Sequence, residues 1–175
     1  MKHFEFEYGY GTMSANLPDD TDVFIPGETV KDPQYIPEDE LETAYIESLS
    51  HSIGMPSLRQ LAHKGTTVTM IIPDRVKGGE QATSHRKLSV RYILRELYAV
   101  GVEKKDILFI ISNGLHPRST SADALALLGQ EVFDEFWLSG QIISHDSEDR
   151  EHMIDLGLTK RGDPVYMNKY VYDSD

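Results

Sequence analysis

The sequence has no cysteine, which excludes disulfide bonds, thiolate metal ligands and a cysteine nucleophile. It has no apolar run near the ~20 residues that span a bilayer, and its first residues lack the apolar segment of a signal peptide. Positive charge is scarce, since 17 Lys and Arg face 29 Asp and Glu and give a formal net charge of -12. Nucleic acids and anionic membranes attract positive charge, so neither is an expected partner. We therefore expect a soluble protein of the cytoplasm.

The hydrophobic pattern of the sequence predicts buried strands that alternate with helices. Apolar, β-branched segments at 66–74, 106–112 and 140–147 are typical of buried strands, and amphipathic segments at 84–100 and 119–136 predict helices between them. A β-α-β-α-β order with near-continuous apolar strands indicates a parallel sheet. We predict an α/β fold with a mostly parallel, Rossmann-like sheet and helices on both faces.

Short β-strands are expected at both ends of the chain. Residues 1–36 alternate apolar and polar side chains and then become rich in proline, which predicts short antiparallel strands and a linker. Residues 37–175 then form the α/β core, which starts with an acidic helix at Pro37. The tail from 153 to 175 predicts paired strands with no closing helix.

Polar segments follow each of the predicted strands. In open α/β sheets, ligands bind where the carboxyl ends of parallel strands meet. Those ends are followed here by "PDRVKGG", "SNGLHPRST" and "SHDSEDREH", and the last two carry histidines. No phosphate-binding P-loop, dinucleotide-binding glycine motif or serine nucleophile elbow is present. We therefore expect a ligand site at this edge, built from ionisable side chains.

His116 has two interpretations on the residues alone. It is either a loop histidine that lies on the surface or caps the next helix, or a general acid/base, because an imidazole pKa near ~6.5 suits proton transfer at neutral pH. Gly114 permits a tight turn before it, and Pro117 stiffens the backbone after it.

The other candidates are also open to two interpretations. Asp74 and Lys77 form either a solvated salt bridge or an anion site, in which a cation held by an acid grips a carboxylate. His145 and Asp146 could act as a base and its orienting acid, or as metal ligands. Adjacent residues at a strand end usually point to different sides, so we do not expect them to share a metal.

The segments "PDRVKGG", "SNGLHPRST" and "SHDSED" together resemble the N-terminal domain of the nickel-dependent lactate racemase family, from about residue 36 onwards. Members of that family have an Asp-x-x-Arg, a Gly-x-His-Arg-Pro-x-Thr and a His-x-Ser-x-Asp-like segment after successive strands. The resemblance implies racemisation or epimerisation of 2-hydroxy acids, by hydride transfer to a nickel pincer nucleotide. Two histidines then serve as acid and base.

The resemblance also implies roles for individual residues. His116 matches the first catalytic histidine, and Asp74 matches the aspartate of the first segment. Lys77 falls where the family has a substrate-holding arginine, and it lacks that arginine's bidentate fork. Arg118 is a further expected substrate-binding residue, although "HPRST" inverts the family's Arg-Pro order. Residues expected to support this site are Asn113, His145 and Asp146.

The second catalytic histidine, the cofactor lysine, the histidine nickel ligand and the C-terminal domain of the family would lie beyond Asp175. We therefore expect an incomplete N-terminal domain of a larger two-domain enzyme, either truncated or a single-domain relative. It should be inactive alone, with no metal or cofactor bound, and its partners would be a small 2-hydroxy acid and the missing C-terminal domain. The alternative is a non-enzymatic carboxylate-binding or interaction domain with a racemase-like fold.

A sheet that lacks its next strand leaves an open edge, which can pair with a second copy of the chain. We predict that the chain forms homodimers through this edge or adds a strand there. Sedimentation velocity over a range of concentrations checks this expectation, and a clean monomer at high concentration would contradict it.

Overall fold

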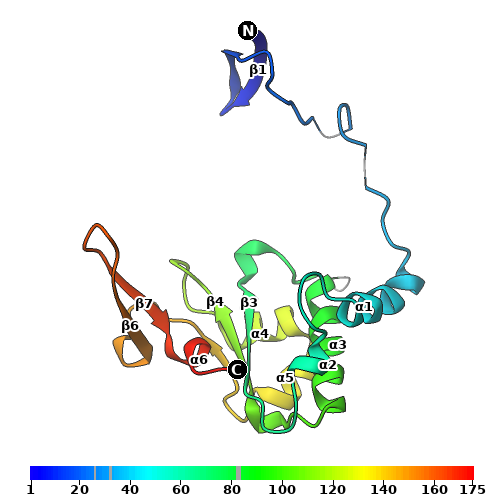
Figure 1. The fold of residues 1–175 in the computed structure, drawn as a ribbon, viewed down its shortest axis with the longest axis vertical. Helices are drawn as coiled ribbons and strands as arrows, with labels where there is room; N and C mark the ends of the chain where they lie inside the picture. Colours follow the sequence, from blue (N-terminus) through cyan, green and yellow to red (C-terminus); the bar gives the residue numbers. More distant parts are fainter. Residues whose placement is uncertain (26, 32, 82–83) are drawn as a thin grey trace. The chain divides into compact units, whose positions relative to one another are not determined.

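The computed structural model describes residues 1–175 except positions 26, 32, 82 and 83, of which the first two fall in or beside the predicted linker. The chain forms two compact units, Met1–Glu38 and Asp39–Asp175. In the first unit, β1 (Lys2–Tyr8) and β2 (Gly11–Leu17) form an antiparallel hairpin, as the alternating pattern predicted (Figure 1).

A parallel sheet lies at the centre of the second unit. Its strands β3 (Val68–Pro73), β4 (Ile107–Ser112) and β5 (Ile142–Ser144) lie in that order (Figure 1). The strands are apolar and β-branched, as suits strands that are buried within a sheet. The predicted α/β class is confirmed.

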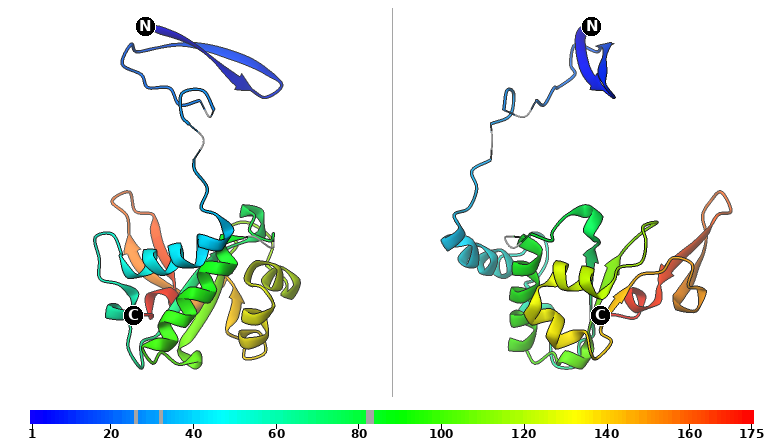
Figure 2. Two further views of the ribbon diagram at one scale, coloured as in Figure 1. Left: turned by 90° about the vertical axis from the view of Figure 1, so that its right-hand side faces the viewer. Right: turned by 180° about the vertical axis from the view of Figure 1, so that it is seen from behind.

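The main helices cover one face of this sheet (Figure 2). They are α3 (His85–Ala99), α4 (Ser121–Leu128) and α5 (Gln130–Phe136), and the shorter α1 (Leu41–Ser50) and α2 (Leu58–Leu61) pack against α3. Right-handed crossovers between consecutive parallel strands place their helices on one side. In the described part of the chain, no helix is long and apolar enough to cross a membrane.

The core lies between that face and the helices. Phe109 of β4 packs edge-to-face on Phe136 of α5, with ring centroids 5.0 Å apart. Both are fully buried, as are Leu97 of α3 and Leu127 of α4. Burial of such side chains contributes about 1.5–3 kcal/mol each. The site loops are therefore attached to a packed core.

The C-terminal tail forms a hairpin and a short helix. Strands β6 (Met153–Leu158) and β7 (Pro164–Asn168) are antiparallel, and α6 (Lys169–Tyr172) follows. Thr69 of β3, which alternates with the core-facing Met70, donates to the Tyr170 carbonyl at 3.0 Å, so α6 lies over the opposite face of the sheet. The expectation of no closing helix was wrong, because Asn168 is a good N-cap and accepts from the Tyr170 N–H.

The single helix predicted over 119–136 is two helices. Gly129 separates α4 from α5 with a φ of +82°, a conformation that no right-handed helix contains. The predicted start is confirmed, since Thr120 and Asp123 form a reciprocal capping box. Short 3₁₀ turns complete the fold at Glu38–Glu40 (η1), Arg75–Lys77 (η2), Lys104–Asp106 (η3) and Arg150–His152 (η4).

An ion pair joins α2 to the buried side of α3. Arg59 donates from Nη2 to Oε1 of Glu96 at 2.8 Å, and its Nε bonds the second oxygen. Glu96 is only 6% exposed. The hydrogen bonds from Arg59 lower the pKa of Glu96, although burial of the carboxylate opposes this.

We predict that Arg59→Met destabilises the domain at pH 7, because it leaves the buried carboxylate of Glu96 charged and without its partner. A carboxyl whose pKa is lowered by folding adds stability above its unfolded pKa and loses it as the pH falls. Urea unfolding measures the free energy of unfolding of the variant and of the unchanged chain. The difference between these two free energies should therefore shrink from pH 7 towards pH 4. Adding Glu96→Gln to the Arg59 variant should recover stability at pH 7, because the unpaired charge is removed. A loss of stability in Arg59→Met that is equal at pH 7 and pH 4 would contradict this account.

Candidate functional site

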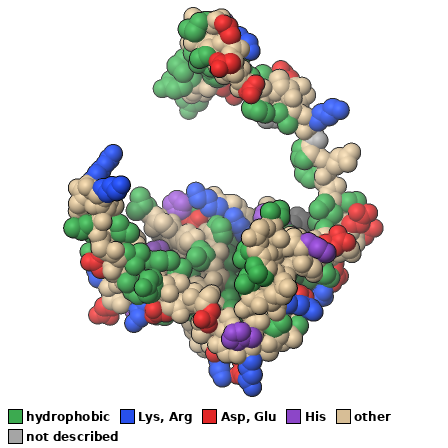
Figure 3. Space-filling view, viewed as in Figure 1, with side chains coloured by type: hydrophobic (Ala, Val, Ile, Leu, Met, Phe, Trp, Pro, Cys, Tyr) green, Lys and Arg blue, Asp and Glu red, His purple; other side chains and the backbone are tan. Residues whose placement is uncertain are grey.

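Two strand-end loops bring Asp74 and His116 into contact. Asp74 directly follows β3 and His116 lies in the loop after β4. The parallel register pairs Pro73 with Ser112, so both strands end side by side. His116 Nδ1 lies 2.6 Å from Asp74 Oδ2. Figure 3 shows histidine and basic side chains along this edge of the core unit, above the ends of β3 and β4 in Figure 1.

The contact orients the imidazole of His116. The Asp74 side chain is only 3% exposed, whereas that of His116 is 36% exposed. A carboxylate oxygen can only accept, so Nδ1 of His116 carries the proton and Nε2 is left as the proton-accepting atom. The other oxygen, Asp74 Oδ1, is buried without a hydrogen-bond partner among the described residues. The pair can therefore present a base of fixed orientation.

Asn113 holds the loop that carries His116. Its buried amide Nδ2 donates to the Pro117 carbonyl at 2.6 Å and to Ser119 Oγ at 3.1 Å. Its Oδ1 accepts from Ser144 Oγ of β5 at 2.6 Å. The His116 N–H closes a turn by donating to the Asn113 carbonyl at 3.0 Å. One side chain thus ties together β4, the loop and β5.

Arg86, in the first turn of α3, holds the loop that carries Asp74. Its guanidinium donates to the carbonyls of Pro73 at 3.4 Å and Lys77 at 3.0 Å, and also to that of Gly78. Gly79 packs directly on it at φ +97°, and a Cβ there would lie 2.6 Å from Arg86 Nη1. The lack of a side chain at Gly79 therefore permits close contact with this arginine. Sequence reasoning missed Arg86, although the glycine pair signalled a close approach.

Two cavities adjoin His116. One, of about 330 Å³, is lined by Asp74, Arg75, His116 and Arg118 among others. The second, of about 260 Å³, is lined by His116, Arg118, His145 and Asp146 among others. Guanidinium groups beside an oriented imidazole can bind a carboxylate while the imidazole accepts a proton.

The structure brings most of the predicted site residues together. Asp74, His116, Arg118, His145 and Asp146 line these cavities, and the buried Asn113 braces the loop between them. Lys77 is exposed, and it lines neither cavity. The binding and catalytic roles assigned to all of these residues stay predictions.

Arg75 is a cavity residue that sequence reasoning missed. It lines the larger cavity beside His116 and lies 3.3 Å from an oxygen of Asp123 in α4. Hydrogen bonds from Thr120, first from its backbone and then from its side chain, lower the pKa of Asp123, and Arg75 lowers it further. An ionised carboxylate therefore holds this guanidinium at the cavity. Its position next to Asp74 in the sequence was the available signal.

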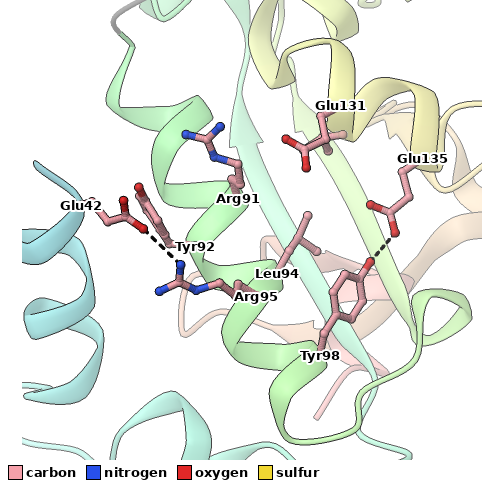
Figure 4. A pocket seen from close by; sticks show the side chains of 9 residues that line it. Glu42, Arg91, Tyr92, Leu94, Arg95, Tyr98, Glu131 and Glu135 are labelled. Atoms are coloured by element: carbon pink, nitrogen blue, oxygen red, sulfur yellow. Dashed lines mark hydrogen bonds and ion pairs between the residues drawn. The ribbon is translucent and has the colours of Figure 1, made fainter.

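A larger groove, of about 530 Å³, lies between α1, α3 and α5 (Figure 4). Its polar side chains are largely paired, Arg95 with Glu42 at 3.1 Å and Tyr98 with Glu135 at 2.6 Å. Burial first, and Glu135 second, raise the pKa of Tyr98 well above its ordinary value. The groove has no histidine and no strand-end loop in its wall, so we place the candidate site at His116.

Among the described residues, no group of three or more His, Asp or Glu is arranged to hold a metal ion. His145 and Asp146 therefore have no third ligand in the described part of the chain.

Comparison with known proteins places this chain in a family. Residues 8–175 match the family model described as lactate racemase N-terminal domain. The chain belongs to this family. The fold is similar to that of the lactate racemase apoprotein from Thermoanaerobacterium thermosaccharolyticum, with a TM-score of 0.63 and 21% sequence identity over 99% of this chain. This chain spans 37% of the length of that racemase. No curated protein matches the sequence.

We predict that Asn113→Ala destabilises the racemase-family domain by about 2 kcal/mol, because it removes the hydrogen bonds that the buried amide makes with Pro117, Ser119 and Ser144. Ser119→Ala removes only one of the hydrogen bonds of the Asn113 amide and is the matched control. It should lower the free energy of unfolding by less than half as much as Asn113→Ala. Urea unfolding at pH 7 measures both, and equal losses for the two variants would contradict this role for Asn113.

Proposed function

We propose that this chain is the N-terminal, substrate-facing domain of a cytoplasmic, lactate-racemase-like enzyme that racemises or epimerises 2-hydroxy acids. The observation that carries the proposal is the hydrogen bond of 2.6 Å between His116 and the buried Asp74, at the strand edge beside Arg75 and Arg118. Membership of the lactate racemase N-terminal domain family supports the same reaction class.

His116 would act as the base of the reaction. With Nδ1–H donating to Asp74, its Nε2 can take the proton of the substrate's hydroxyl group. Asp74 would stabilise the imidazolium that forms, as a buried carboxylate next to a positive charge does. The guanidinium of Arg118, which lines both cavities, would hold the substrate carboxylate, since arginine binds carboxylates through two parallel hydrogen bonds.

Loss of hydride from the α-carbon requires an acceptor. A nickel pincer nucleotide, as the resemblance implies, would supply that acceptor when bound. We propose that other parts of the complete protein hold it, as the resemblance implies. The chain of 175 residues should therefore bind substrate without turning it over.

We predict that His116→Ala in the complete enzyme, matured with its cofactor, lowers the rate of lactate racemisation by a factor of about 10²–10⁴, the usual range for loss of a general base. Chiral chromatography of the lactate enantiomers measures the rate. Leu138→Ala, at an exposed position that lines neither cavity beside His116, is the control and should leave the rate unchanged. Full turnover by the His116 variant would refute the proposal.

A second pair of variants tests whether Arg118 or Lys77 binds the carboxylate of the substrate. Arg118→Met should raise KM for the hydroxy acid by about tenfold or more, because a charged hydrogen bond to the carboxylate is lost. Lys77→Met tests the substrate-holding role that the resemblance implies for Lys77. Because Lys77 is exposed, we expect KM to change less than threefold. If the complete protein binds lactate but never racemises it, the non-enzymatic carboxylate-binding alternative is correct.

A further inference from the structure

His145 is a second histidine that lines the cavity beside His116. The hydrogen-bond partner of His116 is a carboxylate, whereas that of His145 is an amide. Its backbone N–H donates to the Ile111 carbonyl at 2.9 Å, which fixes it beside β4. Its Nδ1 lies 3.1 Å from the amide Nδ2 of Asn168, at the end of β7. Asn168 is thus a residue of the C-terminal hairpin that contacts the site.

The amide of Asn168 can be oriented in only one way. Its Oδ1 accepts the Tyr170 N–H at 3.0 Å, as N-cap of α6, so its Nδ2 faces the imidazole. An amide nitrogen only donates, and Nδ1 of His145 is therefore the acceptor. A neutral imidazole that accepts at Nδ1 carries its proton on Nε2. His145 thus presents an N–H donor at its free edge.

Asn168 is held firmly enough to keep this contact. Tyr170, two residues later, receives the hydrogen bond from Thr69 of β3 at 3.0 Å. Its ring also stacks on His152 with centroids 5.3 Å apart. At the end of the chain, the Thr67 N–H donates to an Asp175 carboxylate oxygen at 2.8 Å. The tail is anchored to β3 at Thr69 and to Thr67 just before it, and Asn168 is positioned with the tail.

The two histidines therefore present opposite tautomers to one cavity of about 260 Å³. His116 offers an acceptor at Nε2, and His145 offers a donor. Arg118 lines the same cavity and adds a guanidinium. Asp146 and Glu148 also line it, and Asp146 Oδ1 accepts the Glu148 N–H at 2.9 Å. The cavity thus combines a base with donors suited to an anion.

We propose that His145 Nε2–H and Arg118 form the subsite for the carboxylate of the 2-hydroxy acid, opposite His116, and that Asn168 is the positioning residue that keeps His145 in its donor tautomer. The inference rests on the proposed function, because the anion is taken to be the substrate's carboxylate. It assigns the C-terminal hairpin a part in the site, through a single hydrogen bond.

Substitution of Asn168 can change the tautomer and leave the fold intact. Asn168→Asp keeps an oxygen that caps α6, since Asp and Asn are equally good N-caps, and places an acceptor opposite His145 Nδ1. The imidazole then carries its proton on Nδ1 and turns a bare nitrogen to the cavity. Asn168→Ser also keeps a cap and withdraws the amide donor without adding charge, so it controls for the new carboxylate.

The test is ¹⁵N NMR of the histidine rings in the chain of 175 residues, at pH 8.5, where imidazoles are ordinarily neutral. We expect the Nε2–H tautomer for His145 in the unchanged chain, the Nδ1–H tautomer in Asn168→Asp, and a mixture in Asn168→Ser. L-lactate and acetate, added up to high millimolar concentration, should both shift the His145 Nε2 resonance, and lactate should shift that of His116 as well. Affinity for both probes should fall about tenfold in Asn168→Asp and about threefold in Asn168→Ser.

Three results would overturn the inference: an Nδ1–H tautomer at His145 in the unchanged chain, unchanged affinity in both variants, or lactate shifts confined to His116. None of these depends on catalysis. The last would leave the proposed function standing, because His116 would still bind the hydroxy acid. Conversely, a complete enzyme that stays active with His116→Ala refutes the function and leaves the carboxylate subsite to be judged by the NMR shifts alone.

Discussion

The candidate site depends on one interaction, the hydrogen bond between the buried carboxylate of Asp74 and the half-buried imidazole of His116. A carboxylate removed from water is unfavourable unless it is paired, and Asp74 uses only one of its oxygens for this pairing among the described residues. The register of β3 and β4 makes the contact possible, because Pro73 and Ser112 end the two strands at the same level. The packed face of the sheet, through Phe109 and its neighbours, holds that register.

Two polar side chains hold the site loops in place without lining either cavity of the site. Arg86 binds backbone carbonyls of the loop after β3, and Asn113 binds backbone and side-chain groups of the loop after β4. Each satisfies polar groups that a loop would otherwise expose to water or leave unpaired. The loops can therefore present Asp74 and His116 at a fixed separation, which proton transfer requires. Loss of either brace would change the geometry of the base rather than its chemistry.

Much of this arrangement follows from local rules that act on the sequence. The strands, α3 and the capping box at Thr120 were predictable from periodicity and N-cap chemistry, and the strand-end rule placed Asp74, His116 and His145 at one edge. The break at Gly129 and the helix α6 were not, because a glycine within a helical pattern and a short cap at a chain end are weak signals. Arg75 was missed because side-chain directions in the 3₁₀ turn η2, which decide whether Arg75 or Lys77 faces the cavity, depend on tertiary contacts such as that with Asp123.

The two histidines at this edge differ in which ring nitrogen carries the proton, and their neighbouring groups determine this difference. An imidazole is intrinsically ambiguous, since either ring nitrogen can carry the proton. A carboxylate, which only accepts, places the proton of His116 on Nδ1 and leaves Nε2 as an acceptor. An amide nitrogen, which only donates, leaves Nδ1 of His145 as the acceptor and places its proton on Nε2. The partners come from opposite ends of the core unit, Asp74 from the first strand of the sheet and Asn168 from the last strand of the tail. Proton acceptor and donor are therefore assigned by the fold as a whole, and the local sequence around either histidine does not contain that assignment.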